Sequence, residues 1–466
     1  MSTPLLKPPP VETDILALIG NTPLLQLRGF DTGPCQLFLK LETQNPGGSI
    51  KDRMALYMVE AAERSGKLPP GGTIIEATAG NTGLGLALVA VVKHYRLILV
   101  IPDKMSQEKI AHLRALGAEI RLTRSDVSKG HPDFYQDYAA RLATEIPDSI
   151  YIDQFSNPAN PQAHEETTGP EIWEQMHHNV DAVVCGVGSG GTMTGLSRYF
   201  ARVNPKVELV LADPQGSGLA EYIVTGHIGK SGPSVVEGIG SSAVPPVADL
   251  SRVRQSYTIA DVESLHVARE LLQKAGILAG SSSGTIVAAA LRYCREQTTA
   301  QRVVSFICDS GNKYLSKMFN DYWMRDQGFL EMPKRGDLRD LIARRYEEGA
   351  VITVGPDDPL LTAFQRMRMA DISQVPVIEN GHPIGILDES DVLMSVQADP
   401  ARFAEPVRGS MTSRLETLSA DASLEEVFDV LERGKVALIV DSVDRDAFAG
   451  LITRTDLINH LRRKLQ

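Results

Sequence analysis

The chain has 466 residues, which is too many for one ordinary hydrophobic core and predicts two to four domains. Its apolar content of 43% and charged content of 23% are those of a soluble globular protein. The formal net charge of −11 argues against a nucleic acid or an anionic membrane as partner, because phosphate groups bind to basic surfaces.

The cysteine spacing and the N-terminal residues predict that the protein resides in the cytoplasm. The cysteines are far apart and form no C-x-x-C pair, so they indicate neither disulfides nor a metal site. We expect buried free thiols in a reducing cytoplasm. Residues 1–10 contain no apolar core of signal-peptide type, and no apolar run approaches the roughly 20 residues that a membrane span requires. The four cysteines are Cys35, Cys185, Cys294 and Cys308.

Short apolar runs alternate with amphipathic stretches from about Asp14 to Phe329. Turn residues bound each run, and a helical pattern precedes or follows it. This alternation predicts a mostly parallel sheet with helices on both faces. The expected buried strands are residues 74–75, 97–101, 182–185, 209–212 and 303–307.

The first motif is residues 45–51 (NPGGSIK), whose lysine opens a helical stretch. A lone lysine is usually a solvated surface charge. At a helix N-terminus, however, the positive end of the macrodipole disfavours a cation, so the placement costs stability unless the amine is neutral or takes part in chemistry. A Schiff-base lysine meets both conditions. Lys51 is therefore a candidate catalytic residue.

The second motif, residues 78–83 (TAGNTG), follows the predicted strand that ends near Glu76. It combines hydroxyls, an amide and glycine backbone N–H groups at the start of a helix. Such a helix start suits the carboxylate of a substrate. The competing interpretation is a simple helix cap formed by Thr78 or Asn81.

The third motif, residues 186–192 (GVGSGGT), again lies between a strand and a helix, where backbone N–H groups can hold a phosphate. Its glycines also match the G-x-G-x-x-G fingerprint of dinucleotide-binding domains, with Asp213 at the end of a later strand. Taken alone, this segment favours an NAD-dependent dehydrogenase. Lys51 and the loop 78–83 decide against that interpretation, because a dinucleotide-binding domain needs neither. A weaker fourth segment, residues 280–285 (GSSSGT), predicts by itself only a flexible loop or a helix start.

The composition changes after Phe329, and the last part of the chain contains an internal repeat. Phe364 recurs as Phe428, and Asp391 recurs as Asp456. Each copy predicts a helix, two strands joined by a turn, and a closing helix. A unit that short cannot bury both of its faces alone, so we expect the two copies to pack as one module.

Together these segments resemble the fold-type II, or β, family of pyridoxal-phosphate enzymes, which includes cysteine synthases and cystathionine β-synthases. The resemblance runs from about Ile15 to Phe329, with the motifs in the same order. It implies an α/β fold of two α/β/α subdomains with mostly parallel sheets. The C-terminal repeat resembles the paired regulatory (Bateman) module, a tandem-repeat α+β module that many cystathionine β-synthases carry. The segments that favour these enzymes within the family are residues 102–109, 113–119, 236–240 and 317–324.

Carried over residue by residue, the resemblance implies a role for each candidate. Lys51 forms the Schiff base with pyridoxal 5′-phosphate and later moves protons. Asn81 hydrogen-bonds the ring hydroxyl of the cofactor, and Ser282 faces its pyridine nitrogen. The residues implied to hold the phosphate are Gly188, Ser189, Gly190, Gly191 and Thr192. Those implied to bind the substrate carboxylate are Thr78, Gly80, Thr82 and, with them, Gln154.

The serine at the pyridine nitrogen has a chemical consequence. A neutral hydroxyl does not keep that nitrogen protonated, so the ring is a weaker electron sink, and loss of a β-substituent is favoured over transamination. The implied activity is that of a lyase that condenses L-serine with L-homocysteine to L-cystathionine and water, the first step of transsulfuration toward cysteine. Sulfide release from cysteine is a further implied reaction. A cysteine synthase acting on O-acetylserine and sulfide is the alternative, and a nucleotide-sensing protein with an inert catalytic domain is a third hypothesis.

Three positions depart from the family pattern. Ala79 replaces a serine that is common in the carboxylate loop, and Phe155 and Ser241 stand where many cystathionine β-synthases have tyrosines. These changes leave the implied reaction type intact but bear on the choice of thiol and leaving group. Animal relatives bind haem through an N-terminal Cys/His extension. Residues 1–13 contain neither residue, so no haem is expected.

Residues 450–456 (GLITRTD) resemble the nucleoside-binding segment of Bateman modules. The resemblance implies that Asp456 accepts hydrogen bonds from ribose and that Thr453 contacts a phosphate. The first copy keeps Asp391 but has Asp388 at the threonine position, where a carboxylate repels phosphate. We therefore expect unequal sites for an adenosine-bearing ligand, either S-adenosylmethionine or an adenine nucleotide. The competing interpretation is a purely structural or dimerising module.

These patterns give the expected domain organisation. The expected parts are an N-terminal extension (1–13), a catalytic domain (14–330), a linker (331–348) and a regulatory module (349–466) with copies at about 349–400 and 406–466.

The family resemblance also suggests a homodimer or a homotetramer, the latter formed through the C-terminal module.

Overall fold

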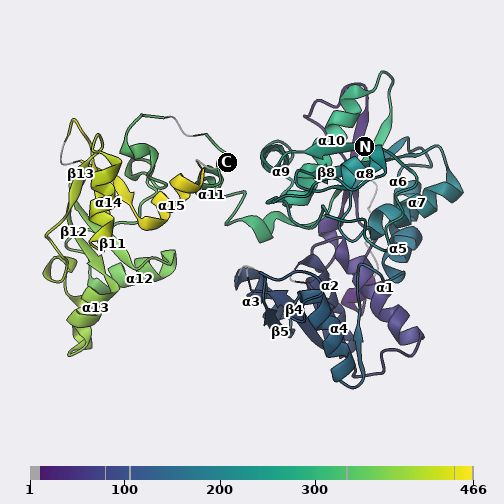
Figure 1. Cartoon of the computed structure of the whole chain (residues 1–466), viewed down its shortest axis with the longest axis horizontal. Coiled ribbons are helices and arrows are strands. Elements are labelled where there is room, and N and C mark those ends of the chain that lie inside the picture. The colour runs from purple at the N-terminus through teal and green to yellow at the C-terminus, as the bar shows by residue number, and fades with distance from the viewer. Residues whose placement is uncertain (1–10, 79, 104–106, 332–333, 445–446, 464–466) are drawn as a thin grey trace, which may run out of the picture. The chain divides into compact units, whose positions relative to one another are not determined.

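The computed structural model describes residues 11–78, 80–103, 107–331, 334–444 and 447–463. The chain forms two compact units, Met1–Met318 and Phe319–Gln466 (Figure 1). The sequence predicts that the catalytic domain ends at residue 330, whereas the first compact unit of the structure ends at Met318.

The larger sheet of the first unit has six strands in the order β1-β2-β10-β7-β8-β9. Neighbouring strands are parallel except for β1 and β2. The strands are β1 (Leu24–Gln26), β2 (Gln36–Leu41), β7 (Ala182–Gly186), β8 (Glu208–Pro214), β9 (Val253–Ile259) and β10 (Arg302–Ile307).

Helices cover both faces of this sheet, because successive side chains of a strand point to opposite faces and here both sets are apolar. Val183 packs in one cluster with Leu196 of α7, and Val184 packs in another with Ile286 of α10. Figure 1 shows α9 and α10 on one side of β8 and α6 and α7 on the other. The helices of this half are α5 (Ala159–Ala163), a π-helical turn (His164–Thr168), α6 (Gly169–Gln175), α7 (Gly191–Val203), α8 (Leu219–Thr225), α9 (Asp261–Ala275) and α10 (Ser281–Glu296).

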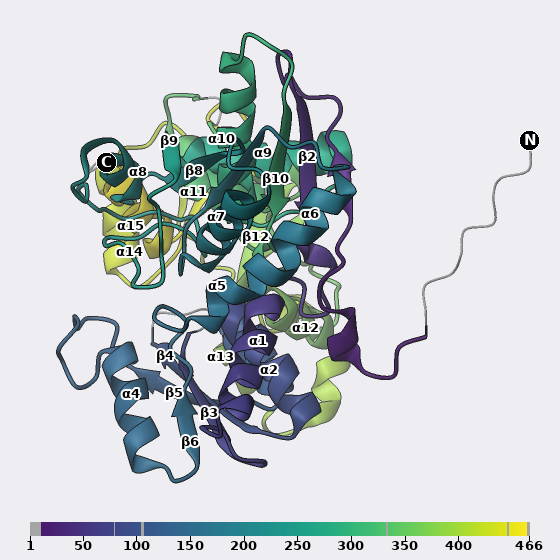
Figure 2. The ribbon, with the colours of Figure 1, turned by 90° about the vertical axis from the view of Figure 1, so that its right-hand side faces the viewer.

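The smaller sheet is wholly parallel, with the order β5-β4-β3-β6. Ile74 packs with α1 and α2, and its neighbour Ile75 packs with α4 on the opposite face. Figure 2 shows β3 between these helices. The elements are α1 (Lys51–Arg64), β3 (Thr73–Ala77), α2 (Asn81–Lys93), β4 (Arg96–Pro102), α3 (Gln107–Ala115), β5 (Glu119–Thr123), α4 (Tyr135–Glu145) and β6 (Ser149–Tyr151).

The predicted strands are confirmed as β3, β4, β7, β8 and β10, and the α/β fold with two mostly parallel sheets is confirmed with them. Strand β3 ends at Ala77 and α2 begins at Asn81, while the segment 187–190 leads from β7 into α7. Ligands of parallel α/β sheets bind at these strand ends. The sheets therefore position both sequence motifs where a site is expected.

The second unit contains the two repeats. The predicted order of helix, strand, strand and helix is confirmed in both copies. The unit opens with α11 (Asp321–Asp326); the first copy is α12 (Leu360–Ala370), β11 (Gln374–Glu379), β12 (His382–Asp388) and α13 (Glu389–Val396), and the second is β13 (Thr417–Ser419), α14 (Leu424–Glu432), β14 (Ala437–Val440), β15 (Phe448–Ile452) and α15 (Arg454–Arg463).

Part of the segment that was expected to be a linker belongs to the core of the second copy. Leu338 and Ile342 pack in one apolar cluster with Val427 of α14 and Ile439 of β14. The backbone N–H of Leu338 also donates to the carbonyl of Ala420 at 2.8 Å. A segment that precedes the first copy in the sequence therefore packs in the core of the second copy.

No helix in the described residues has the length and apolar content needed to cross a membrane. No group of three or more His, Cys, Asp or Glu side chains in the same ranges is arranged to hold a metal ion.

Candidate active site

Motifs that are far apart in the sequence meet in one cavity of the first unit. Lys51, Asn81 and Ser282 line this cavity together with the glycine loop, residues 188–192. The structure thus brings together all the residues that the sequence assigned to the cofactor. The other lining residues are Ile50, Cys185, Gly186, Gly238, Ile239, Phe306 and Cys308.

Lys51 is the first residue of α1 and is partly buried. The backbone N–H of Ile50 donates to the carbonyl of Cys308 at 2.9 Å and fixes the start of the helix against the end of β10. Burial lowers the pKa of the Lys51 amine, and Cys308 and Asp309 act in the opposite direction. A neutral amine is the form that attacks an aldehyde and takes up a proton.

The glycine loop has no space for a side chain at any of its three glycines. A Cβ on Gly188 would lie 2.3 Å from the carbonyl oxygen of Gly238, and one on Gly191 would lie 1.9 Å from Oδ1 of Asn160. Gly190 has φ +92°, a left-handed conformation that glycine adopts without strain. Helix α7 begins at Gly191, so its first backbone N–H groups have no partner within the helix. This narrow loop at a helix N-terminus fits a phosphate group.

Two buried side chains that the sequence analysis missed support this loop from behind. Asn160 Nδ2 donates to Ser189 Oγ at 2.9 Å and to the carbonyl of Gln154 at 2.8 Å. Nε2 of His164, in the π-helical turn, lies 3.2 Å from Thr192 Oγ1. Burial lowers the pKa of His164 well below its ordinary value, so the imidazole is neutral. Neither residue has a sequence signal, because each lies far from the glycine loop along the chain.

Lys51 also lines a wider cavity of about 810 Å³, together with the residues assigned to the substrate carboxylate. Its volume is within the range of small-molecule sites. Thr82 Oγ1 donates to Gln154 Oε1 at 2.7 Å, so the structure places these two side chains together. The assigned residues that line the cavity are Thr78, Gly80, Thr82 and Gln154.

The three departures from the family pattern are placed as follows. Phe155 and Ser241 both line the wider cavity. The Ser241 hydroxyl donates to the carbonyl of Ala243 at 2.6 Å, and the Ser241 N–H donates to Ser217 Oγ at 2.9 Å. Ala79 lies outside the described residues.

The acidic residue of the dinucleotide fingerprint does not line this site. Asp213 is fully buried at the end of β8, and its Oδ2 accepts a hydrogen bond from the backbone N–H of Ala220 at 2.7 Å. A carboxylate buried in this way has no access to a ribose. The fingerprint therefore lacks the residue that a dinucleotide requires.

Comparisons with known proteins agree with this geometry. The family described as "Pyridoxal-phosphate dependent enzyme" matches residues 15–309, and the family described as "CBS domain" matches residues 339–398 and 406–463. A cystathionine beta-synthase from Mus musculus is 37% identical over 100% of this chain and 84% of its own. The chain belongs to the cystathionine β-synthase family. Its cofactor is pyridoxal phosphate, and the interpretation as a dinucleotide-binding domain is wrong.

Two further matches cover about two thirds of this cystathionine β-synthase family member. Cysteine synthase 1 from Neurospora crassa is 41% identical over 67% of this chain and 84% of its own. A hydrogen sulfide-producing enzyme from Fusobacterium nucleatum has a solved structure that matches with a TM-score of 0.61. It is 36% identical and covers 66% of this chain and 100% of its own. The resemblance to fold-type II enzymes is thereby confirmed.

In the regulatory module, the residues assigned to a nucleoside also cap helices. Thr453 donates to Asp456 Oδ2 from its backbone N–H at 2.8 Å and from its hydroxyl at 2.6 Å. Asp388 and Asp391 form a reciprocal capping box at the start of α13. Burial raises the pKa of Asp391, the N–H of Asp388 opposes this shift, and the Asp388 carboxylate reinforces it. The two copies thus differ in charge at equivalent positions.

Proposed function

We propose that this protein is a pyridoxal-phosphate-dependent lyase that condenses L-serine with L-homocysteine to give L-cystathionine and water. One observation carries the proposal. The similarity to cystathionine β-synthases spans the catalytic unit and the paired module together, and Lys51 and the glycine loop line one cavity. This reaction is the first step of transsulfuration toward cysteine.

Each part of the site has a separate role in the proposed reaction. When bound, pyridoxal phosphate supplies the electron sink that lets the Cα proton and the β-hydroxyl leave. The Lys51 amine takes the proton from Cα and then protonates the departing hydroxyl, which leaves as water. The loop containing Thr78 and Thr82 binds the substrate carboxylate through hydroxyls and the N-terminus of α2. Ser282, in the first turn of α10, would meet the pyridine nitrogen of the bound cofactor with a group that carries no charge.

The alternative is a cysteine synthase that uses O-acetylserine and sulfide. It is supported by the match to cysteine synthase 1 from Neurospora crassa over 67% of this chain. The hydrogen sulfide-producing enzyme from Fusobacterium nucleatum supports sulfide release from cysteine as a further reaction. Phe155 and Ser241 line the cavity where these substrates would differ.

A direct comparison of products tests the proposal. We expect the purified holoenzyme to form cystathionine from serine and homocysteine faster than it forms cysteine from O-acetylserine and sulfide. Both products are measured by mass spectrometry at equal substrate concentrations. Cysteine formation with no cystathionine would replace the proposed function by the alternative.

We also propose that the regulatory module binds an adenosine-bearing ligand, S-adenosylmethionine or an adenine nucleotide. Thr453 and Asp456 are the proposed contacts in the second copy, and Asp391 is the proposed contact in the first. The carboxylate of Asp388 beside Asp391 makes the first site less suited to a phosphate, because like charges repel.

Calorimetric titration of the full-length holoenzyme tests this ligand. We expect S-adenosylmethionine or ATP to release heat, and Asp456→Ala to remove most of it. Asp391→Ala is the comparison variant: it removes the equivalent helix cap and the proposed contact of the less suited first site, so a smaller loss is expected. Equal loss of binding in both variants would contradict unequal sites, and no heat with either ligand would favour a structural module.

The proposed assembly is a homodimer or a homotetramer in the cytoplasm. An exposed apolar groove on α14 and α15 supports self-association, because Phe428, Ile458 and Leu461 are 38%, 63% and 43% exposed there. The four free thiols are those expected of a reducing compartment.

A further inference from the structure

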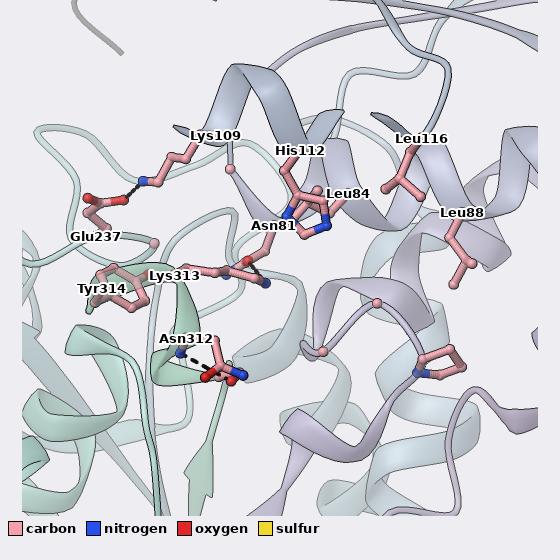
Figure 3. A pocket seen from close by; sticks show the side chains of 16 residues that line it. Asn81, Leu84, Leu88, Lys109, His112, Leu116, Glu237, Asn312, Lys313 and Tyr314 are labelled. Carbon is pink, nitrogen blue, oxygen red and sulfur yellow. Dashed lines mark hydrogen bonds and ion pairs between the residues drawn. The ribbon is translucent and has the colours of Figure 1, made fainter. Parts of the chain in front are cut away.

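A third cavity of the first unit, about 380 Å³, lies beside Asn81 (Figure 3). It is lined by Leu84 and Leu88 of α2, by Lys109 and His112 of α3, by Leu116 just beyond α3, and by polar side chains that follow β10. Lys313, in the short 3-10 turn Gly311–Tyr314, points from this cavity to Asn81. Asn81 also lines the cofactor cavity and the substrate cavity, so its carboxamide is shared by all three.

Two opposite charges hold this carboxamide. Lys313 Nζ donates to Asn81 Oδ1 at 2.6 Å, and Asn81 Nδ2 donates to Asp309 Oδ2 at 2.8 Å. An ammonium only donates and a carboxylate only accepts. Reversing the amide would therefore set donor against donor and acceptor against acceptor, so a single orientation is allowed. The other N–H of Asn81 has no acceptor among the described residues.

The surroundings hold the charged partners in place. Asp309 is 1% exposed, and its Oδ2 also accepts a hydrogen bond from the hydroxyl of Tyr314 at 2.9 Å. Burial lowers the pKa of Lys313, and Asp309 and Asp52 act in the opposite direction. Burial likewise raises the pKa of Asp309, and Lys313 opposes that shift. Each charge thus offsets part of the cost of burying the other across the amide, and each of the two hydrogen bonds is charge-assisted.

We propose that Lys313 and Asp309 are positioning residues of the cofactor site, which act through Asn81. They leave one N–H of the carboxamide for the ring hydroxyl of pyridoxal phosphate, and the Lys313 charge strengthens that N–H as a donor. The proposal rests on the proposed role of Asn81 toward the cofactor. Its consequence is that Lys313 favours the form of the bound cofactor with negative charge on the ring oxygen and a proton on the imine nitrogen.

The test compares the visible spectrum and cofactor affinity of the holoenzyme with those of Lys313→Met. The form with the protonated imine absorbs at about 410 nm, a property of the cofactor itself. We expect the share of this band to fall in Lys313→Met, with a gain at shorter wavelength. We also expect about 3- to 10-fold weaker binding of pyridoxal phosphate to the apoenzyme, the scale of one net hydrogen bond.

Two further variants separate positioning from a general effect of the charge. Lys313→Arg keeps a cationic donor and is expected to recover most of the band. Lys317→Met removes a cation from the same segment that pairs with Glu237 at 2.8 Å and not with Asn81. It is expected to leave the spectrum unchanged.

The inference would be overturned if Lys313→Met had the spectrum and affinity of the wild type, or if Lys317→Met shifted both as much. Because the measured signal belongs to the cofactor, its outcome is independent of the reaction catalysed. A wild-type protein that binds pyridoxal phosphate but makes no cystathionine contradicts the proposed function and leaves this test intact.

Discussion

Lys51→Ala is expected to reduce cystathionine formation by about 10²–10⁴-fold, the usual contribution of a positioned acid–base group. The substitution removes the only amine among the residues that line the cofactor cavity in the described part of the chain. The glycine loop is untouched, so the phosphate is still expected to bind. The loss should therefore fall on kcat, while the cofactor stays bound without a covalent link.

Borohydride reduction followed by peptide mapping checks the covalent link. In the wild type we expect the cofactor mass on the peptide that contains Lys51, and in the variant on no peptide. Lys67→Ala is the matched control, because Lys67 is an exposed lysine beyond the C-terminal end of α1. Full activity of Lys51→Ala, or a label on another lysine, would contradict the assignment.

Arg53→Met is expected to lower the free energy of unfolding of the catalytic unit by about 3–5 kcal/mol, the usual cost of breaking a buried ion pair. Arg53 Nε lies 2.7 Å from Glu42 Oε2, and the two side chains are 1% and 0% exposed. Arg53 Nη1 lies 2.6 Å from Glu171 Oε1, and Lys40 Nζ lies 2.7 Å from Glu171 Oε2. Burial raises the pKa of Glu171, but Arg53 and Lys40 outweigh it and lower the value to about 2. Removing Arg53 leaves Glu42 charged and without its main partner.

Denaturant unfolding followed by intrinsic fluorescence measures this loss. Arg64→Met is the matched control on the same helix, because Arg64 is 61% exposed and its pairing with Glu60 spans 3.6 Å. It should change stability by less than about 0.5 kcal/mol. A second replacement, Glu42→Gln in the Arg53→Met background, should recover part of the loss, because it removes the stranded charge. Equal effects of Arg53→Met and Arg64→Met would contradict the role of the buried network.

The features that could be predicted from the sequence are those with local patterns. The apolar runs of β3 and β7 mark strands because both faces of each sheet are covered, and the glycines after β7 stand at positions that have no space for a side chain. Lys51 stands out because a lysine at a helix start is electrostatically unfavourable. These signals depend on residues close together in the chain.

The residues that were missed act through contacts between distant segments. Asn160 supports Ser189 from 29 positions away, and Lys313 reaches Asn81 from 232 positions away. Both contacts depend on which distant segments the fold brings together, and no spacing in the sequence encodes that. The packing of Leu338 with the second repeat was missed for the same reason.

The path of the chain through the second unit makes its two repeats interdependent. Leu338 and Ile342 fill the core of the second repeat, yet they precede the first repeat in the sequence. The first repeat is thus inserted between two segments of the chain that pack in the core of the second repeat. Deleting the second repeat would expose the apolar residues that precede the first repeat. A protein truncated between the two repeats would therefore carry exposed apolar surface instead of a folded half.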